Sequence, residues 1–284
     1  MNVLITGATG FIGRHVVSAF SSSFPQSVIY AGCRRPAGFD MQGVKNVVPV
    51  HHDIWDEGHD ITFAKPYDVI IHLSWPLIHK YNDVIHLDEV LSAQKRFVDQ
   101  ALDSSKNITI AGTCFEYGLQ EGKLTEDLKP RPVTAYGSAK DELRKYIFNE
   151  LKAQVKWLRI FYVYGEGQSE FSIIPQLEKA IAEKNQYFNM SPGQQVRDYI
   201  RVEDLAKMIV ELAVKTNVNG VFNCCSNNPV TLENFIKNYL YKNHPQSEIM
   251  LNLGFFSYNT LEPLEFWGDN SKLIKAISST HEIE

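Results

Sequence analysis

The first thirteen residues constrain the fold of this chain more than any other stretch. Residues 2–5 read as a short buried strand, and Gly7, Gly10 and Gly13 lead into an apolar helical segment over 15–20. A strand, a glycine-rich turn and a helix N-terminus together form an anion site. The first glycine permits a tight turn, the second lets the backbone approach a pyrophosphate, and the third lets the helix pack on the strand. The G-x-x-G-x-x-G spacing differs from the usual G-x-G-x-x-G fingerprint, but in this context it predicts a nucleotide-binding loop.

Composition excludes several classes of protein. The chain has 284 residues, 44% hydrophobic and 21% charged, as expected for a globular protein with one large core, or one core and a smaller appendage. Its net charge of −5 argues against a nucleic-acid surface or a basic membrane-binding face. No apolar run approaches the roughly 20 residues that span a bilayer, and no signal peptide is visible. The four cysteines lack a C-x-x-C spacing, so we expect a cytoplasmic protein with reduced thiols and no metal site.

Apolar strands alternate with helical patterns over the first part of the chain. The expected strands are 2–5, 28–33, 47–51, 68–73, 108–111 and 155–160, and the expected helices are 14–22, 88–104 and 138–151. Strands that are apolar throughout and alternate with helices form parallel sheets with right-handed connections. The sequence therefore predicts an α/β fold with a Rossmann-type, doubly wound parallel sheet.

The pattern becomes less regular after residue 165. Further helices are expected at 173–183, 202–214 and 231–241, separated by Gly, Pro and Asn. No repeat, low-complexity tract or flexible linker separates the two parts, so we expect one compact body. We predict a dinucleotide-binding domain over 1–165 and a smaller substrate-binding part over 166–284, with some of its segments returning to the first domain.

A tyrosine and a lysine share one face of an expected helix. Tyr136 and Lys140 are four residues apart, which places the phenol and the ammonium side by side. A free tyrosine has a pKa of about 10, and a fixed positive charge nearby favours the phenolate and lowers that pKa. The spacing therefore predicts an acid–base tyrosine, with an exposed helix pair as the alternative.

Thr113 follows directly on the strand that begins at residue 108. In a parallel sheet, ligands bind beyond the carboxyl ends of the strands, so Thr113 is expected at the rim of a site. The alternative is a loop hydroxyl that satisfies backbone groups.

These motifs occur together in one family. The opening TGATGFIG, Thr113 ahead of Tyr117–Gly118, and the YGSAK stretch at 136–140 resemble the extended short-chain dehydrogenases/reductases. More narrowly, the chain resembles the NAD-dependent epimerase/dehydratase branch, which acts on nucleotide-activated sugars. Further matches are Asp53–Ile54, Ile71-His-Leu73, Arg159 with Val163-Tyr-Gly165, Arg197-Asp-Tyr-Ile200 and Asp269-Asn-Ser-Lys272.

The resemblance implies a role for each catalytic candidate. Tyr136 would be the acid/base that gives its proton to a sugar oxygen as hydride reaches the adjacent carbon. Lys140 would hold the nicotinamide ribose and lower the pKa of Tyr136. Thr113 would hydrogen-bond the same sugar oxygen.

The resemblance also implies the binding contacts. Gly7, Gly10 and Gly13 would bracket the pyrophosphate of the cofactor, and Asp53 with Ile54 would hold its adenine. The remaining implied cofactor contacts are Phe11, Ile12, Leu73 and Ser74, together with Lys140. Arg197 resembles a ligand of the substrate's nucleotide phosphate, although an arginine fork also suits a carboxylate in a surface ion pair. Tyr162 stands where many relatives carry an asparagine that contacts the sugar nucleotide.

The end of the second strand favours NADP over NAD. NAD-binding relatives place an acidic residue there, whereas this chain has Gly32-Cys33-Arg34-Arg35. Two guanidiniums can pair with the 2′-phosphate and no carboxylate repels it, and Arg14 could add charge. A solvated basic corner is the alternative.

Departures from the family pattern limit the reactions that we expect this chain to catalyse. Dehydratases carry Asp and Glu after the catalytic threonine, and here Cys114 and Phe115 take those positions. We therefore predict an NADPH-dependent reductase of a nucleotide-linked 4-keto-6-deoxy sugar. The alternatives are a nucleotide-sugar 4-epimerase with a retained cofactor and a non-catalytic NADP-binding regulator. A homodimer through the helices over 88–104 and 138–151 is a family expectation.

Overall fold

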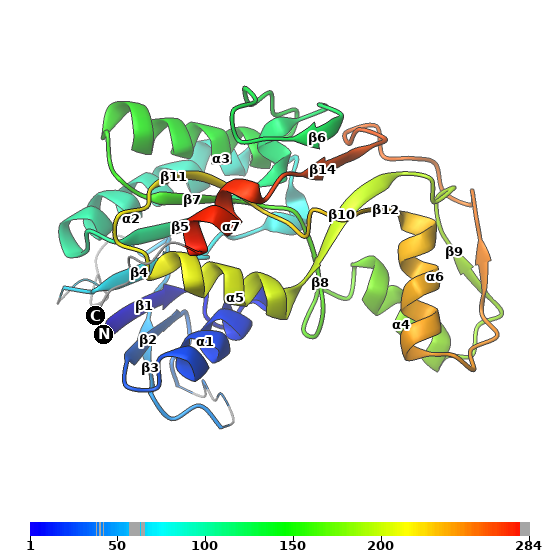
Figure 1. Ribbon diagram of the computed structural model, residues 1–284, viewed down its shortest axis with the longest axis horizontal. Helices are drawn as coiled ribbons and strands as arrows, with labels where there is room; N and C mark the ends of the chain where they lie inside the picture. The colour runs from blue at the N-terminus through cyan, green and yellow to red at the C-terminus, as the bar shows by residue number, and fades with distance from the viewer. Residues whose placement is uncertain (38, 40, 42, 57–62, 64–65, 279–284) are drawn as a thin grey trace.

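The computed structural model describes residues 1–37, 39, 41, 43–56, 63 and 66–278, and its main body is built on one sheet (Figure 1). Seven parallel strands lie in the order β11-β7-β5-β4-β1-β2-β3. Their bounds are β1 (Asn2–Thr6), β2 (Val28–Cys33), β3 (Val47–His51), β4 (Val69–His72), β5 (Ile108–Thr113), β7 (Lys156–Ile160) and β11 (Gly220–Cys224). This confirms the predicted doubly wound α/β fold.

The strand order reverses beside β1. From β1 the chain passes outward through β2 and β3, and it then crosses back to β4 and continues to β5 and β7 on the other side. A doubly wound sheet binds its ligands at this switch point, because the loops after the two central strands diverge there and leave a crevice. The topology of the sheet alone therefore indicates where a cofactor can bind.

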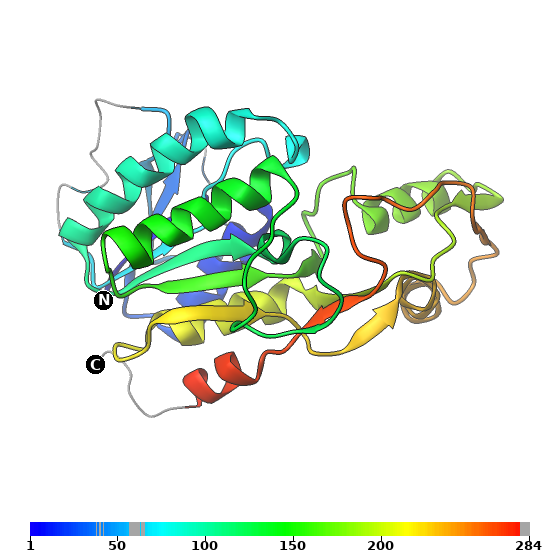
Figure 2. The same cartoon turned by 90° about the horizontal axis from the view of Figure 1, so that it is seen from above.

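Helices cover both faces of the sheet (Figure 2). On one face lie α1 (Phe11–Ser23), α5 (Val202–Ala213) and α7 (Ser271–Ile277); on the other lie α2 (Leu91–Ser104) and α3 (Ala135–Lys145). Each face has its own apolar core, with Val3, Phe20 and Leu205 in the first and Leu4, Phe97 and Leu143 in the second. Strands buried on both faces are mainly apolar, which is why the sequence pattern revealed them.

Two expected helices contain a π-helical turn. The predicted 88–104 segment is η3 (His86–Val90) followed by α2, and the predicted 138–151 segment is α3 followed by η5 (Tyr146–Glu150). The α3 helix begins earlier than predicted because Thr134 caps it, its side chain accepting a hydrogen bond of 3.0 Å from the Gly137 amide. Tyr136 therefore lies in the first turn of α3.

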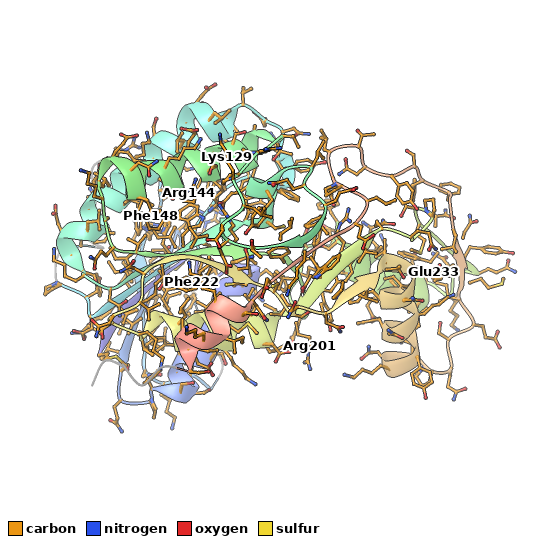
Figure 3. The ribbon with its side chains drawn as sticks, turned by 45° about the horizontal axis from the view of Figure 1, so that its top comes forward. Lys129, Arg144, Phe148, Arg201, Phe222 and Glu233 are labelled. Carbon is orange, nitrogen blue, oxygen red and sulfur yellow. The ribbon has the colours of Figure 1, made fainter. Side chains whose placement is uncertain are left out.

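A smaller lobe lies beyond the carboxyl ends of β5 and β7 (Figure 1). It contains α4 (Ile173–Ala182), α6 (Leu232–Asn243) and the short strands β8 (Tyr162–Tyr164), β9 (Tyr187–Asn189), β10 (Val196–Arg201), β12 (Pro229–Thr231) and β13 (Met250–Asn252). Its own core includes Leu177, Phe188 and Phe235. Figure 3 marks Glu233 in this lobe and Phe222 of β11 in the main body, to which the chain returns at α5.

The remaining elements of the described residues are short strands and 3-10 turns. They are β6 (Gly122–Leu124), which pairs with β14 (Phe266–Gly268), and the 3-10 turns η2 (Ile78–Lys80) and η4 (Cys114–Tyr117). Strands of three residues give no readable periodicity, so the sequence did not predict them. None of the helices in the described ranges is long and apolar enough to cross a membrane. The same residues contain no metal-binding group of three or more His, Cys, Asp or Glu side chains, and all four cysteines are buried and free.

Candidate active site

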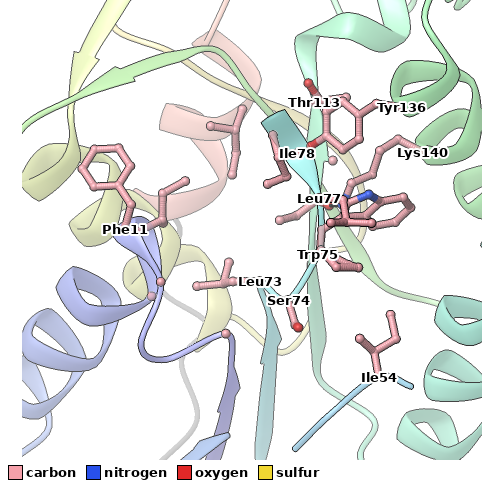
Figure 4. Close-up of a pocket in the computed structure, with 18 of the residues that line it drawn as sticks. Phe11, Ile54, Leu73, Ser74, Trp75, Leu77, Ile78, Thr113, Tyr136 and Lys140 are labelled. Carbon is pink, nitrogen blue, oxygen red and sulfur yellow. Dashed lines mark hydrogen bonds between the residues drawn. The ribbon is translucent and has the colours of Figure 1, made fainter. Parts of the chain in front are cut away.

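A cavity of about 730 Å³ opens at the switch point of the sheet (Figure 4). Its walls come from the ends of β1, β2, β4 and β5, from the start of α1 and from α3. The predicted site residues that line it are Gly7, Gly10, Phe11, Ile12, Gly13, Arg34, Asp53, Ile54, Leu73, Ser74, Thr113, Tyr136, Lys140 and Tyr162. Arg14, Arg35 and Arg197 lie outside this lining.

The glycine-rich turn has no room for side chains. Gly7 has a φ of +69°, and a Cβ on Gly13 would come within 2.0 Å of the Gly7 carbonyl oxygen. The Gly10 amide donates to that carbonyl at 2.9 Å and closes the turn, after which α1 begins at Phe11 with no acidic residue in its first turn. Free amides at a helix start without a carboxylate nearby favour a bound anion. The cradle therefore fits the pyrophosphate of a dinucleotide.

The cavity lining includes one of the three predicted arginines. Arg34 and Arg35 are both exposed; Arg34 follows β2 and lines the cavity with Asp53 and Ile54, whereas Arg35 lies outside the lining. Arg14 donates instead to the Thr9 and Gly10 carbonyls, at 3.1 and 3.4 Å. Of the three, only Arg34 is thus placed to meet a group bound in the cavity.

Thr113 ends β5 and caps the η4 turn. Its hydroxyl accepts from the Phe115 amide at 3.3 Å, and the Glu116 carboxylate accepts from the Thr113 amide at 2.9 Å. This reciprocal pair is a capping box, which fixes the Thr113 backbone at the rim. Thr113 therefore does both things that the sequence allowed: its hydroxyl hydrogen-bonds a backbone amide, and the residue lines the cavity.

Tyr136 faces Thr113 across the cavity wall (Figure 4). Burial raises the pKa of Tyr136, the nearby Glu116 carboxylate raises it further, and a hydrogen bond with the Thr113 side chain lowers it. The pKa of Tyr136 is thus raised overall, whereas a lowered pKa was predicted from the neighbouring Lys140, because desolvation of the phenolate dominates. The phenol is accordingly a protonated group poised to donate.

Lys140 points away from the phenol. Its ammonium donates to the Ala111 carbonyl at 2.6 Å and lies 3.8 Å from the centroid of the Trp75 ring, against 5.9 Å to the Tyr136 ring. Burial lowers the pKa of Lys140 to about 7, and the Glu116 carboxylate opposes this. The lysine is therefore held at the cavity wall by a carbonyl and an aromatic face.

Glu116 is a residue of the site that sequence reasoning did not identify. Its fully buried carboxylate accepts from Trp157 Nε1 at 2.9 Å and from Arg159 Nε at 2.8 Å, in addition to the Thr113 amide. Arg144 lies 3.8 Å away. The T-x-x-E spacing of Thr113 and Glu116 is a capping-box signature that could have revealed it.

Several other cavity-lining residues were also missed: His52, Trp55, Trp75, Pro76, Leu77, Ile78 and His79. Five of them belong to the loop after β4, where Leu77 adopts a left-handed backbone with φ of 57°. A leucine with positive φ is strained, and such residues concentrate at functional sites. A positive φ at a leucine leaves no sequence signal, so only the structure reveals this loop as a wall of the cavity.

A second cavity of about 280 Å³ lies in the smaller lobe and shares Tyr162 and Val163 with the first. Aromatic rings of Tyr199 and Phe235 stack at 3.9 Å in its wall. Arg197 lines it and donates to Glu262 at 3.1 Å, so this arginine makes an ion pair, but a buried one and not the surface pair given as the alternative. Tyr162 also hydrogen-bonds Glu262.

The fold and the cavity define a class of protein, the short-chain dehydrogenases/reductases of the extended type, in which the Thr–Tyr–Lys set and the glycine-rich turn line one cavity. Within it, the chain belongs to the NAD dependent epimerase/dehydratase family, whose model matches residues 3–225. The resemblance seen in the motifs is thereby confirmed, and the protein is an enzyme of that family.

Similar proteins include two sugar dehydrogenases from Aggregatibacter actinomycetemcomitans. The dTDP-6-deoxy-L-talose 4-dehydrogenase (NAD(+)) is 26% identical over 94% of this chain and 99% of its own length. The GDP-6-deoxy-D-talose 4-dehydrogenase is 24% identical over 99% and 92%. Among solved structures, the UDP-N-acetylglucosamine 4-epimerase of Methanobrevibacter ruminantium M1, in complex with UDP-N-acetylmuramic acid, has a TM-score of 0.83 at 19% identity, covering 99% of this chain and 93% of that one. That likeness concerns the fold.

Proposed function

We propose that this protein uses NADPH to reduce a nucleotide-linked 4-keto-6-deoxy sugar to the 6-deoxy sugar. The observation that carries the proposal is the pairing of a buried, protonated Tyr136 with Thr113 at the cavity rim. The two similar dehydrogenases support it, because a 4-dehydrogenase and a 4-ketoreductase catalyse one redox interconversion in opposite directions. Cys114 and Phe115 line the cavity where a dehydratase would need Asp and Glu.

The residues present fit a nicotinamide dinucleotide, which supplies the hydride when it is bound. The glycine cradle would hold its pyrophosphate, and Lys140 would hold the nicotinamide ribose. Tyr136 would donate its proton to the O4 oxygen of the sugar, and Thr113 would hydrogen-bond the same oxygen and orient it. Burial keeps the proton on the Tyr136 oxygen, so the phenol holds the proton that the ketone would accept, although its raised pKa also makes it a weaker acid.

The preference for NADP rests on one residue. Arg34 lines the cavity at the end of β2, where its guanidinium can pair with a 2′-phosphate. The name of the dTDP-sugar relative specifies NAD(+), so this preference would distinguish the present protein from that relative. Binding of both cofactors to one preparation, measured by calorimetry, tests it directly.

The nucleotide of the substrate would lie in the second cavity, which shares the lining residues Tyr162 and Val163 with the first. Its stacked aromatic wall suits a base, and Arg197 suits a phosphate once Glu262 is displaced. The division into a cofactor domain over 1–165 and a substrate-binding part over 166–284 follows from this placement. Pairing of α2 and α3 with their copies would make a homodimer, which light scattering would detect.

The decisive experiment supplies the purified protein with NADPH and a nucleotide 4-keto-6-deoxy sugar. The proposal expects preparations largely free of cofactor, stoichiometric loss of reduced-nicotinamide absorbance, and a product heavier by two hydrogens. A protein that retains tightly bound NAD and interconverts two 4-hydroxy sugars without net oxidation is the epimerase. Cofactor binding without turnover of either kind of sugar would identify a non-catalytic regulator.

A further inference from the structure

Trp75 lies against both catalytic side chains, although neither the motifs nor the proposed reaction assigns it a role. It follows β4 by three residues, is 8% exposed and lines the main cavity. Its ring centroid is 3.8 Å from the Lys140 ammonium and 5.7 Å from the Tyr136 ring, which it meets edge-on. Figure 4 shows the indole beside the end of the Lys140 side chain.

A buried histidine fixes the indole in place. Trp75 Nε1 donates to His86 Nδ1 at 3.2 Å, so the ring proton of a neutral His86 is on Nε2, where it meets the Lys80 carbonyl at 3.2 Å. His86 is fully buried, and this burial lowers its pKa and keeps it neutral. The Trp75 ring thus has one hydrogen-bonded edge and one face turned to Lys140.

The ammonium of Lys140 needs such a partner. It is 2% exposed and donates to one protein oxygen, that of Ala111, among the hydrogen bonds of the described residues. The titratable groups that face it are Glu116 from η4, His72 from β4, His86 from η3 and Tyr136 from α3. Of these four only Glu116 favours the charged lysine, and a desolvated ammonium gains from the negative face of an aromatic ring, most of all from tryptophan.

We propose that Trp75 is a positioning residue, whose indole face, anchored by His86, holds Lys140 charged and aimed along the wall of the cofactor cavity. The proposal rests on the role proposed above for Lys140. It predicts that the π-face of the Trp75 ring, as well as its volume, stabilises the charged form of Lys140. Phenylalanine should preserve part of the effect, and leucine, which fills space without a π-system, should preserve little of it.

The test measures the titration of Lys140 itself by ¹³C NMR at its Cε, assigned with a Lys140→Arg variant. The titration midpoint should move about one pH unit lower in Trp75→Leu and about half a unit lower in Trp75→Phe. Trp267→Phe, which alters a half-buried tryptophan of β14 outside both cavities, should leave it unchanged. If the enzyme turns over, the alkaline limb of its kcat/KM profile should move in the same direction, because the charged lysine is the active form.

Equal Lys140 titrations in wild type and folded Trp75→Leu would overturn the proposal. If Trp75→Leu does not fold, Trp75→Phe decides, since an unchanged midpoint there is the same contradiction. The NMR readout needs no substrate. A shifted Lys140 titration in a protein that reduces no keto sugar would therefore reject the proposed reaction and leave the role of Trp75 standing.

Discussion

Replacing Glu116 by glutamine should destabilise the protein by several kcal/mol. The carboxylate is fully buried and serves three donors at 2.8–2.9 Å, which are the Thr113 amide, Trp157 Nε1 and Arg159 Nε. Glutamine keeps one acceptor oxygen, but its NH₂ group must then face a donor, and the Arg159 charge loses its buried partner. Breaking a buried ion pair from one side costs about 3–5 kcal/mol, within a total stability of about 5–15 kcal/mol.

Urea denaturation followed by circular dichroism measures this loss. The exposed Glu121→Gln change on the following loop is the matched control and should stay within about 0.5 kcal/mol of wild type. The double variant with Arg159→Met should lose less than the sum of the two single changes, because it leaves no uncompensated charge. A loss below about 1 kcal/mol for Glu116→Gln would refute the reasoning from burial and pairing.

The same substitution should alter the site as well as the fold. The Glu116 charge raises the pKa of Lys140, against the lowering by burial. Without that charge the pKa of Lys140 falls, so the charged lysine is lost at lower pH. The alkaline limb of the pH profile of kcat/KM should therefore move to lower pH in Glu116→Gln, measured under conditions in which the variant is folded.

Three further predictions follow from individual side chains. Tyr136→Phe should retain cofactor binding and lose turnover by at least ~10²-fold, and near-normal activity in a folded variant would remove Tyr136 from the mechanism. Arg34→Ala should weaken NADPH binding by about 1.5–3 kcal/mol and leave NADH binding nearly unchanged. Arg35→Ala should change the binding of either cofactor little. Equal losses for both cofactors in Arg34→Ala would mean that Arg34 supports structure. Burial lowers the pKa of Lys156 to about 7, so between about pH 7 and 10 the unfolded chain binds more protons and stability rises with pH. Lys156→Met should flatten that rise in urea titrations, and an unchanged slope would contradict the burial argument.

Much of the fold could be predicted because its signals are local. The glycine spacing at Gly7, Gly10 and Gly13 and the apolar runs of the buried strands each lie within a few residues, so a single sequence reveals them. The strand ends then place Thr113, and helical spacing places Tyr136 and Lys140 on one face. These inferences needed no long-range contact.

The electrostatics of the site could not be predicted, because they depend on residues distant in the chain. The Tyr–Lys spacing predicted a lowered pKa for Tyr136, but Trp75 and His86 pack against the phenol, and the Lys140 ammonium lies against the Trp75 ring instead. Arg197 was expected to bind a phosphate of the substrate, yet its side chain donates to Glu262, 65 residues later in the chain. Only the folded chain brings these groups together.

Transfer of a deuterium label tests the central claim most directly. NADPH carrying deuterium at the transferred position of the nicotinamide is incubated with the enzyme and a nucleotide 4-keto-6-deoxy sugar, and the product is examined by mass spectrometry and NMR. The proposed reduction predicts one deuterium on C4 of each product molecule and an equal amount of oxidised cofactor. A sugar inverted at C4 without label and without consumption of NADPH would contradict it.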